Sequence, residues 1–334
     1  MPAPLLLVLA PVLALAGAAL SFGLCRRAAR HGWLPNAVTA RSAHRVPVSR
    51  AGGAVVCGVA SLIVAVWAGL TGWPVFAPLF ALVLAGGGIG LLDDRREMGP
   101  RAKLALLSII AGVAAWRLGP LPDPPGLVLP DGIGYALAAF WVLGFVNVFN
   151  FMDGLNGMAA GTGAVLLAAL AVIGGAHAPL ALLVVGPLLG FAVLNVARGA
   201  PFLGDAGSLS LGVLIAGGAL AAEDGFWVIA AGAVPFIADA ALTLAVRARR
   251  GADLLAAHDE HAYQRMAKRG VRHAGVAALY AALAAAGAGS VLLLGAGSVF
   301  VVAPLVALAW FASTRLALRQ LDRRTEASAR RSSA

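Results

Sequence analysis

The stretch Gly86-Gly-Gly-Ile-Gly-Leu-Leu-Asp93-Asp94 runs an apolar segment directly into two adjacent carboxylates. A membrane-spanning helix needs about 20 predominantly apolar residues, and the segment 74–92 supplies that length. Two acids at a helix C-terminus oppose the helix macrodipole, so their placement is unfavourable unless something cationic binds there. A solvated helix end is the alternative interpretation. The stretch therefore predicts a transmembrane helix that ends in a candidate cation site.

The same apolar pattern fills the rest of the chain. A mean hydropathy of +0.89 and 60% hydrophobic residues over 334 positions exclude an ordinary soluble domain. We predict an all-α integral membrane protein, a polytopic bundle of about eleven (or ten) transmembrane helices in one domain over residues 1–334. A basic, disordered tail is expected at 319–334. The candidate spans are 4–24, 51–71, 74–92, 103–119, 134–152, 157–175, 179–197, 207–222, 226–246, 274–294 and 298–316.

The basic residues predict the orientation of this bundle. Of the 25 lysines and arginines, all except Arg117 fall on one side of the predicted membrane. By the positive-inside rule the N-terminus lies outside and the C-terminus is cytoplasmic. Arg26-Arg27 follow the first span and no base precedes it, which is the reverse of a secretory signal. Because the bases flank spans, the net charge of +10 indicates anionic lipid contact and no nucleic acid.

Carboxylates gather on the side that already holds the bases. Asp93, Asp94, Asp153 and Asp205 each lie at or beside the end of an apolar run. Mg²⁺ prefers oxygen ligands and commonly takes one or two carboxylates plus substrate phosphates. Lys103, one of only two lysines, suits a phosphate as a compact point charge, although a membrane anchor explains it nearly as well. The pattern favours membrane-surface chemistry on a phosphate-bearing substrate.

The segment 147–157 carries four polar residues at every third position, namely Asn147, Asn150, Asp153 and Asn156. On a helix this spacing drifts by only about 60° per step, so the four share one face. Polar groups within a span are costly and usually face a cavity or a partner. Hydrogen bonds to neighbouring helices are the alternative. We interpret this stripe as part of a binding site.

Two further segments carry candidate residues. Asp205 precedes a span that enters from the cytoplasm, where it can cap the helix or hold a metal ion. Asp239 lies inside the segment 226–246, where an acid indicates either a site or snorkelling toward Arg247. The loop before the tenth span is either a solvated basic loop or a binder of a diphosphate or nucleotide, through His261, Tyr263, Gln264 and Arg265.

Taken in order, these segments resemble the polyprenyl-phosphate N-acetylhexosamine-1-phosphate transferases, the glycosyltransferase family 4 that includes MraY-, WecA- and WbpL-type enzymes. Asp93-Asp94 followed by Lys103-Leu104 is similar to the family's aspartate-pair motif. Residues 147–161 resemble its Asn-rich DG motif, and residues 204–212 resemble its GD-GS-LG motif. The resemblance covers nearly the whole chain, from Pro35 to Gly270.

The resemblance implies transfer of a sugar-1-phosphate from a UDP-N-acetylhexosamine to undecaprenyl phosphate, with release of UMP. It implies Mg²⁺, or Mn²⁺ in its place, bound mainly by Asp205 with Asp153. Asp93 or Asp94 would act on the lipid phosphate, and Asn150 and Asp153 would line the nucleotide site. The enzyme would lie in the bacterial inner membrane with its active site on the cytoplasmic face, and a homodimer is compatible with this arrangement.

Two departures from the family pattern narrow the range of substrates that the resemblance implies. Asn156 stands where many members carry a second aspartate, so any role of that acid is in doubt here. The late loop reads His261-Ala-Tyr-Gln-Arg265 instead of a histidine triad, which argues against the peptidoglycan phospho-MurNAc-pentapeptide translocase. With the segment 41–44 (Arg-Ser-Ala-His), it favours a cell-envelope polysaccharide such as O-antigen of lipopolysaccharide, and an N-acetylated hexosamine donor that includes 6-deoxy sugars.

A multispanning transporter is the alternative from another class. Its polar residues would form a path across the membrane, with repeated halves and broken helices near the midplane. In this chain the polar residues cluster at one face, with Asp239 the main exception. A catalytically inactive scaffold would be expected to lack one of the four clustered acids.

Overall fold

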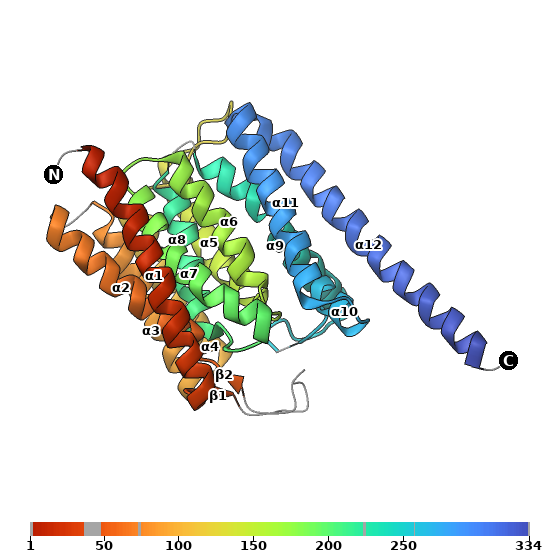
Figure 1. The fold of residues 1–334 in the computed structure, drawn as a ribbon. Coiled ribbons are helices and arrows are strands. Elements are labelled where there is room, and N and C mark those ends of the chain that lie inside the picture. The colour runs from red at the N-terminus through yellow and green to blue at the C-terminus, as the bar shows by residue number, and fades with distance from the viewer. Residues whose placement is uncertain (1–2, 37–47, 73–74, 223–224, 257, 333–334) are drawn as a thin grey trace.

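The computed structural model describes residues 3–36, 48–72, 75–222, 225–256 and 258–332. In these ranges the chain is a bundle of helices with one antiparallel pair of two-residue strands (Figure 1). The elements are α1 (Ala3–His31), β1 (Pro35–Asn36), β2 (Val48–Ser49), α2 (Gly52–Thr71), α3 (Ala77–Arg96), α4 (Pro100–Leu118), α5 (Asp131–Phe151), α6 (Met158–Ile173), α7 (Ala178–Arg198), α8 (Gly204–Leu220), α9 (Phe226–Arg249), α10 (Ala262–Lys268), α11 (His273–Leu294), η2 (Ala296–Ser298) and α12 (Val299–Ser332).

Each predicted span coincides with one helix, and the all-α polytopic membrane class is confirmed. Within the described residues, eight helices are long and apolar enough to cross a membrane, while α6 and α8 are apolar but shorter. Helix α4, predicted to span, is not among these eight. The number of crossings and the orientation stay predictions.

The C-terminal tail, for which disorder is expected from the sequence, belongs to the last helix up to residue 332. Helix α12 continues through 319–332 and projects from the bundle (Figure 1). The tail's alanine, arginine and glutamate residues are strong helix formers, which favours continuation of the helix.

Helix α8 is the centre of the bundle. Every residue from Ala206 to Leu220 is buried, and α2, α3, α5, α6 and α9 all pack against it. A helix that is apolar all round belongs in the interior of a protein. The outer helices instead expose large apolar side chains, such as Trp116, Phe140 and Leu293. Such wide apolar exposure is suited to lipid and not to water.

Glycine makes possible the helix crossing that positions the candidate site. A Cβ built on Gly90 would lie 2.1 Å from the carbonyl oxygen of Asp205, so α3 and α8 are in backbone contact there. A Cβ on Gly53 would lie 2.1 Å from the backbone nitrogen of Gly207, which brings α2 equally close. Small residues allow such close approach between membrane helices. The C-terminal end of α3 is therefore held against the first turn of α8.

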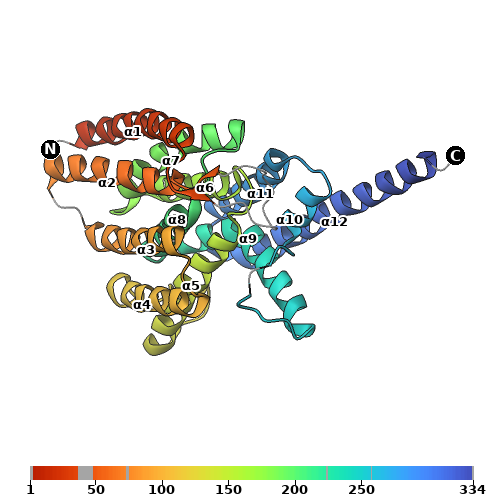
Figure 2. The ribbon, with the colours of Figure 1, turned by 90° about the horizontal axis from the view of Figure 1, so that it is seen from below.

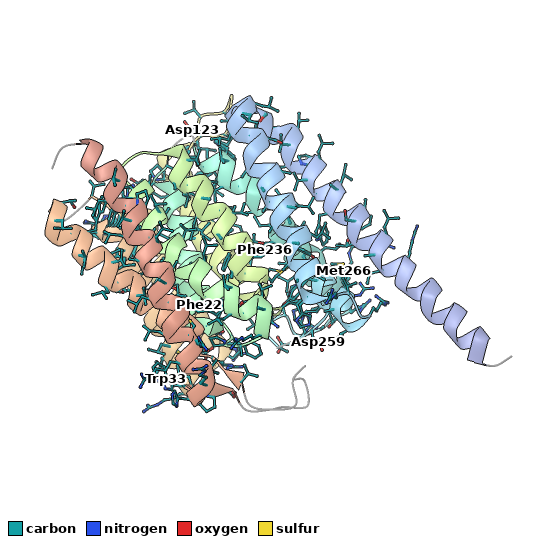
Figure 3. The ribbon with its side chains drawn as sticks, viewed as in Figure 1. Phe22, Trp33, Asp123, Phe236, Asp259 and Met266 are labelled. Atoms are coloured by element: carbon teal, nitrogen blue, oxygen red, sulfur yellow. The ribbon has the colours of Figure 1, made fainter. Side chains whose placement is uncertain are left out.

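The two ends of the bundle are distinct. Asp123, in the connection from α4 to α5, lies at one end, and Trp33 and Asp259 lie at the other (Figure 3). The second end also carries β1, β2 and α10 (Figure 1), and we call it the α10 end. It receives the C-terminal ends of α3, α5 and α9 and the N-terminal end of α8.

Candidate active site

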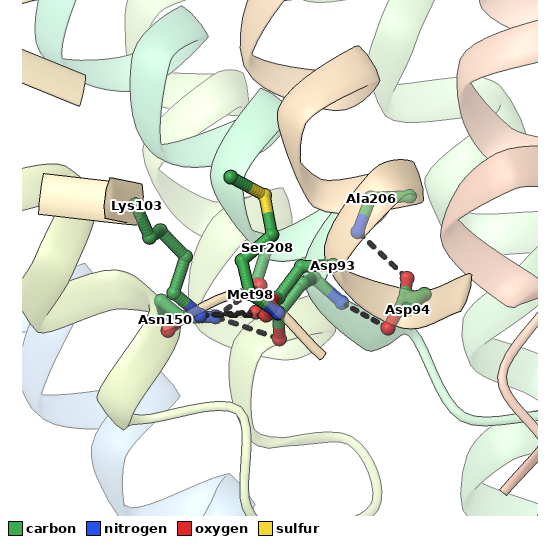
Figure 4. Close-up of polar contacts among 8 residues, drawn as sticks. Asp93, Asp94, Met98, Lys103, Asn150, Ala206 and Ser208 are labelled. Carbon is green, nitrogen blue, oxygen red and sulfur yellow. Dashed lines mark hydrogen bonds and ion pairs between the residues drawn. The ribbon is translucent and has the colours of Figure 1, made fainter. Parts of the chain in front are cut away.

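A lysine and two aspartates from three helices meet at the α10 end (Figure 4). The Lys103 ammonium, in the first turn of α4, lies 2.8 Å from Asp93 Oδ2 and 2.6 Å from Asp205 Oδ2. Asp93 belongs to the last turn of α3 and Asp205 to the first turn of α8. The three side chains are partly exposed, so the bridge is open to a ligand from the surface.

Asp94 performs a different task from its neighbour. Its carboxylate accepts the backbone N–H of Asp205 at 3.0 Å and that of Ala206 at 2.9 Å. These are orphan donors at the start of α8, and no side chain at the N-cap position satisfies them. A carboxylate at this place also complements the positive end of the helix dipole. Of the two adjacent acids, Asp94 thus anchors α8 and Asp93 faces Lys103.

Asn150 joins the last turn of α5 to the same point. Its Nδ2 donates to Asp205 Oδ1 at 3.1 Å and to Ser208 Oγ at 2.8 Å. Asn147, predicted on the same stripe, donates instead to the carbonyl of Leu143 in its own helix at 2.7 Å. The expected stripe therefore contributes Asn150 to the site, while Asn147 serves the helix.

Asp153 lies just beyond α5, half-buried, and its side chain adds a fourth carboxylate near those of Asp94 and Asp205. Burial raises the pKa of Asp153 well above its usual value, and repulsion from Asp205 and Asp94 adds to this shift. Arg50 opposes the shift, which places a guanidinium near the acids. The sequence does not distinguish Arg50 from the other bases after the first span. We call the following set the acidic cluster: Asp93, Asp94, Lys103, Asn150, Asp153 and Asp205.

The donor set of the acidic cluster fits a divalent cation that also binds phosphate. Among the described residues, no three His, Cys, Asp or Glu side chains are arranged to hold a metal ion by themselves. Mg²⁺ does not need such a cage, since it commonly takes one or two carboxylates together with substrate oxygens. Asp205 and Asp153 are hard oxygen ligands whose mutual repulsion a cation would relieve. These two residues would hold the ion.

Asn195 contacts the segment 153–157, although the sequence did not predict it as a site residue. The Asn195 side chain accepts the Gly157 N–H at 2.6 Å and donates to the Pro201 carbonyl at 2.9 Å. These two hydrogen bonds connect the turn after α5 to the loop before α8. Asn156, predicted to bind substrate, lies beside Gly199 at the end of α7. Predicted residues 41–44 lie outside the described residues.

Asp239, predicted either to belong to a site or to snorkel toward Arg247, contacts the start of α10. It is fully buried and accepts the N–H of Ala262 at 2.8 Å, the N–H of Tyr263 at 3.1 Å and the hydroxyl of Tyr280 at 2.6 Å. Arg247, the expected snorkelling partner, pairs with Glu260. Asp239 therefore holds the start of α10, because a buried carboxylate needs several donors.

The loop residues predicted to bind substrate separate into two groups. His261 and Tyr263 are buried, and the Tyr263 hydroxyl donates to the Phe151 carbonyl at 2.8 Å, directly before the Asp153 turn. Gln264 accepts the His261 N–H at 3.2 Å and so completes the helix start. Arg265 is exposed and lines a cavity between α9, α10 and α12. Through the Tyr263 hydrogen bond, the loop thus contacts the backbone just before Asp153 of the acidic cluster.

We expect Asp239→Asn to lower the free energy of unfolding by about 2 kcal/mol or more, because an amide cannot accept all the donors that a charged carboxylate satisfies. Thermal unfolding of the purified protein measures this change. Asp253→Asn, at an exposed acid that accepts the N–H of Leu255, is the matched control. A stable Asp239→Asn protein with a raised KM for its soluble substrate would contradict the structural role.

Comparison with known proteins gives one family. Residues 75–223 match the family model described as Glycosyl transferase family 4. The chain is similar to proteins named phospho-N-acetylmuramoyl-pentapeptide-transferase. That of Enterococcus hirae is 35% identical over 189 residues, 49% of this chain and 58% of the relative. That of Streptococcus thermophilus strain CNRZ 1066 is 34% identical over 160 residues, 42% of this chain and 47% of the relative. The chain spans about half the length of these relatives. The family match includes the whole acidic cluster and ends before α9.

Proposed function

Because this chain belongs to glycosyl transferase family 4, we propose that it transfers a sugar-1-phosphate from a UDP-N-acetylhexosamine to a polyprenyl phosphate. The observation that carries the proposal is the bridge from Asp93 through Lys103 to Asp205, at the end of a bundle with a lipid-suited surface. An enzyme that joins a membrane lipid to a soluble nucleotide sugar needs its charged groups at such an end. By the distribution of bases, that end faces the cytoplasm of a bacterial inner membrane.

The reaction forms one phosphorus–oxygen bond and breaks another. In a direct route, an oxygen of the lipid phosphate attacks the β-phosphorus of the UDP-sugar, and the bond from that phosphorus to the bridging oxygen of UMP breaks. A two-step route, in which an aspartate carboxylate first displaces UMP and the lipid phosphate then displaces the aspartate, fits the same residues. UMP leaves and a polyprenyl diphosphate-linked sugar remains. Both substrates are anionic, so catalysis consists largely of positioning them and compensating their charge.

The residues of the acidic cluster have separate tasks in this proposal. The Lys103 ammonium, fixed between Asp93 and Asp205, attracts phosphate oxygens and keeps its charge because two carboxylates surround it. Asp93 faces the lipid phosphate, since Asp94 is occupied by the amides of α8. Asn150 orients Asp205 by hydrogen bonding to Oδ1. A divalent cation, Mg²⁺ or Mn²⁺, held by Asp205 and Asp153 would compensate the charge that develops on the leaving UMP.

The donor we favour is an N-acetylated hexosamine, including 6-deoxy forms, in the first step of an envelope polysaccharide such as O-antigen. The second candidate is UDP-MurNAc-pentapeptide, which the names of the similar curated proteins support. Against it, the late loop lacks a histidine triad, and its His261 is only 2% exposed and serves the start of α10. A buried histidine does not present itself to a large soluble substrate.

UMP release by the purified protein tests the proposal. We expect release that requires undecaprenyl phosphate and a UDP-N-acetylhexosamine together, and that stops when EDTA removes divalent cations and returns with excess Mg²⁺. A panel of UDP-GlcNAc, UDP-GalNAc, a 6-deoxy UDP-HexNAc and UDP-MurNAc-pentapeptide identifies the donor. Release only with the pentapeptide would replace the favoured donor by the second candidate. No release with any donor, from folded protein and lipid accepted by a related enzyme, would contradict the transferase and favour the transporter.

A further inference from the structure

A cavity of about 590 Å³ lies between α9, α10 and α12 at the α10 end. Its walls differ in character. Apolar side chains of α9 and α12, among them Leu242 and Phe311, form one part. The other part carries six basic side chains and three acidic ones: Arg250, Arg265, Lys268, Arg269, Arg315 and Arg319, with Asp239, Asp259 and Glu260. A ligand with one anionic end and one apolar end matches both parts.

The basic part of the cavity has more positive charge than the neighbouring acids compensate. Lys268 pairs with Asp259 at 2.5 Å, and Arg250 lies 3.7 Å from Glu260. No ion pair joins Arg265, Arg315 or Arg319 to any acid whose side chain the structure describes. Arg315 lies with its guanidinium 5.0 Å from the centre of the Phe311 ring, at the boundary between the two parts. The side chains of Arg265, Arg315 and Arg319 are exposed, so an anion can reach their guanidinium groups.

This cavity is separate from the acidic cluster. None of the six residues of the cluster lines it. Viewed along the bundle, α10 and α12 lie on the opposite side from α3 and α4, which carry Asp93 and Lys103 (Figure 2). Met266 of α10 lies beside α12 at the same end (Figure 3). Arg265, predicted to belong either to a solvated basic loop or to a diphosphate or nucleotide site, lines this cavity.

We propose that the cavity binds an anionic phospholipid of the surrounding bilayer. The phosphate lies among Arg265, Arg315 and Arg319, whose planar guanidinium groups hold phosphate oxygens in pairs. An acyl chain follows Leu242 and Phe311 toward the membrane interior. Basic pockets between membrane helices at the cytoplasmic surface are suited to such headgroups. The proposal does not depend on the transferase reaction, because it uses no residue of the acidic cluster.

Native mass spectrometry of the full-length protein, titrated with phosphatidylglycerol in neutral detergent, tests the proposal. We expect the triple variant Arg265→Gln, Arg315→Gln, Arg319→Gln to bind phosphatidylglycerol at least about tenfold more weakly, as loss of charge-assisted hydrogen bonds implies. The matched control removes the same charge from exposed positions on α1, with Arg26→Gln, Arg27→Gln and Arg30→Gln, and should retain the affinity. Arg315→Lys keeps the charge without the paired geometry and should fall between the two.

Other outcomes overturn the proposal. Equal weakening in both triple variants would mean that phosphatidylglycerol responds to overall charge and not to this cavity. Displacement of the lipid by millimolar inorganic phosphate would identify the ligand as a soluble anion. Stronger binding of undecaprenyl phosphate, lost in the cavity triple variant, would make the cavity a subsite for the acceptor lipid. Thermal unfolding of each variant verifies that the binding change is not a loss of fold.

Discussion

Asp205→Asn is expected to lower UMP release by about 10²-fold or more while the protein stays folded, the scale on which loss of one preorganised electrostatic group acts. The side chain changes from a carboxylate to an amide without a change of size. Its Oδ2 now lies 2.6 Å from the Lys103 ammonium. An amide nitrogen at that place would be a hydrogen-bond donor facing the Lys103 ammonium, which is also a donor. The negative charge available to a cation would be lost.

The rate of UMP release, measured over a range of Mg²⁺ concentrations, checks this expectation. Asp123→Asn is the matched control, because Asp123 is exposed at the opposite end and accepts a local N–H, that of Leu129. We expect this control to keep the normal rate. Near-normal release from Asp205→Asn would remove Asp205 from the catalytic site. An equal loss in both variants would show that the substitution acts through the protein as a whole.

Gly90→Ala is expected to destabilise the protein and to lower its activity, although it adds only one methyl group. The new Cβ would lie 2.1 Å from the Asp205 carbonyl oxygen and 2.3 Å from its carbonyl carbon. Backbone cannot yield as a flexible side chain can, so α3 and α8 must move apart. Overpacking of this kind typically costs about 1–3 kcal/mol. The same movement would weaken the Asp94 cap and the Lys103 bridge, and a displacement of about 1 Å can cost 10²-fold in rate.

Gly88→Ala is the control for this prediction, since it lies on the same helix and its Cβ would meet nothing within 4 Å. Alanine is the better helix former by about 1 kcal/mol, so this variant should be as stable as the parent or more stable. Thermal unfolding and UMP release of the two variants give the comparison. Equal behaviour of Gly88→Ala and Gly90→Ala would contradict the close crossing of α3 and α8.

The sequence alone was sufficient for the helical membrane class and the segments that form the long helices. Partition between water and lipid acts on each segment of about 20 residues, so hydropathy reports it without knowledge of the fold. It also indicated that Asp93, Lys103, Asn150 and Asp205 lie at segment ends on one side. The structure brings these four together.

The different contacts of the adjacent acids Asp93 and Asp94 could not be predicted from the sequence. Successive residues on a helix point about 100° apart, so which of Asp93 and Asp94 faces α8 depends on how α3 is rotated against it. That rotation follows from the contact at Gly90, which joins two segments more than a hundred positions apart in the chain. Gly90 itself looked like one of several glycines in an apolar run.

The partners of Asp239 in α9 and of Arg265 in α10 could not be predicted from the sequence either. An acid inside an apolar span and a base in a loop both look available to a substrate when only their neighbours in sequence are known. In the fold, Asp239 accepts the backbone N–H groups at the start of α10, and Arg265 lines the cavity between α9, α10 and α12. Local composition determines which segments enter the membrane, whereas the partners of each polar group are determined by helix packing, since hydrogen bonds and ion pairs act only over a few ångströms.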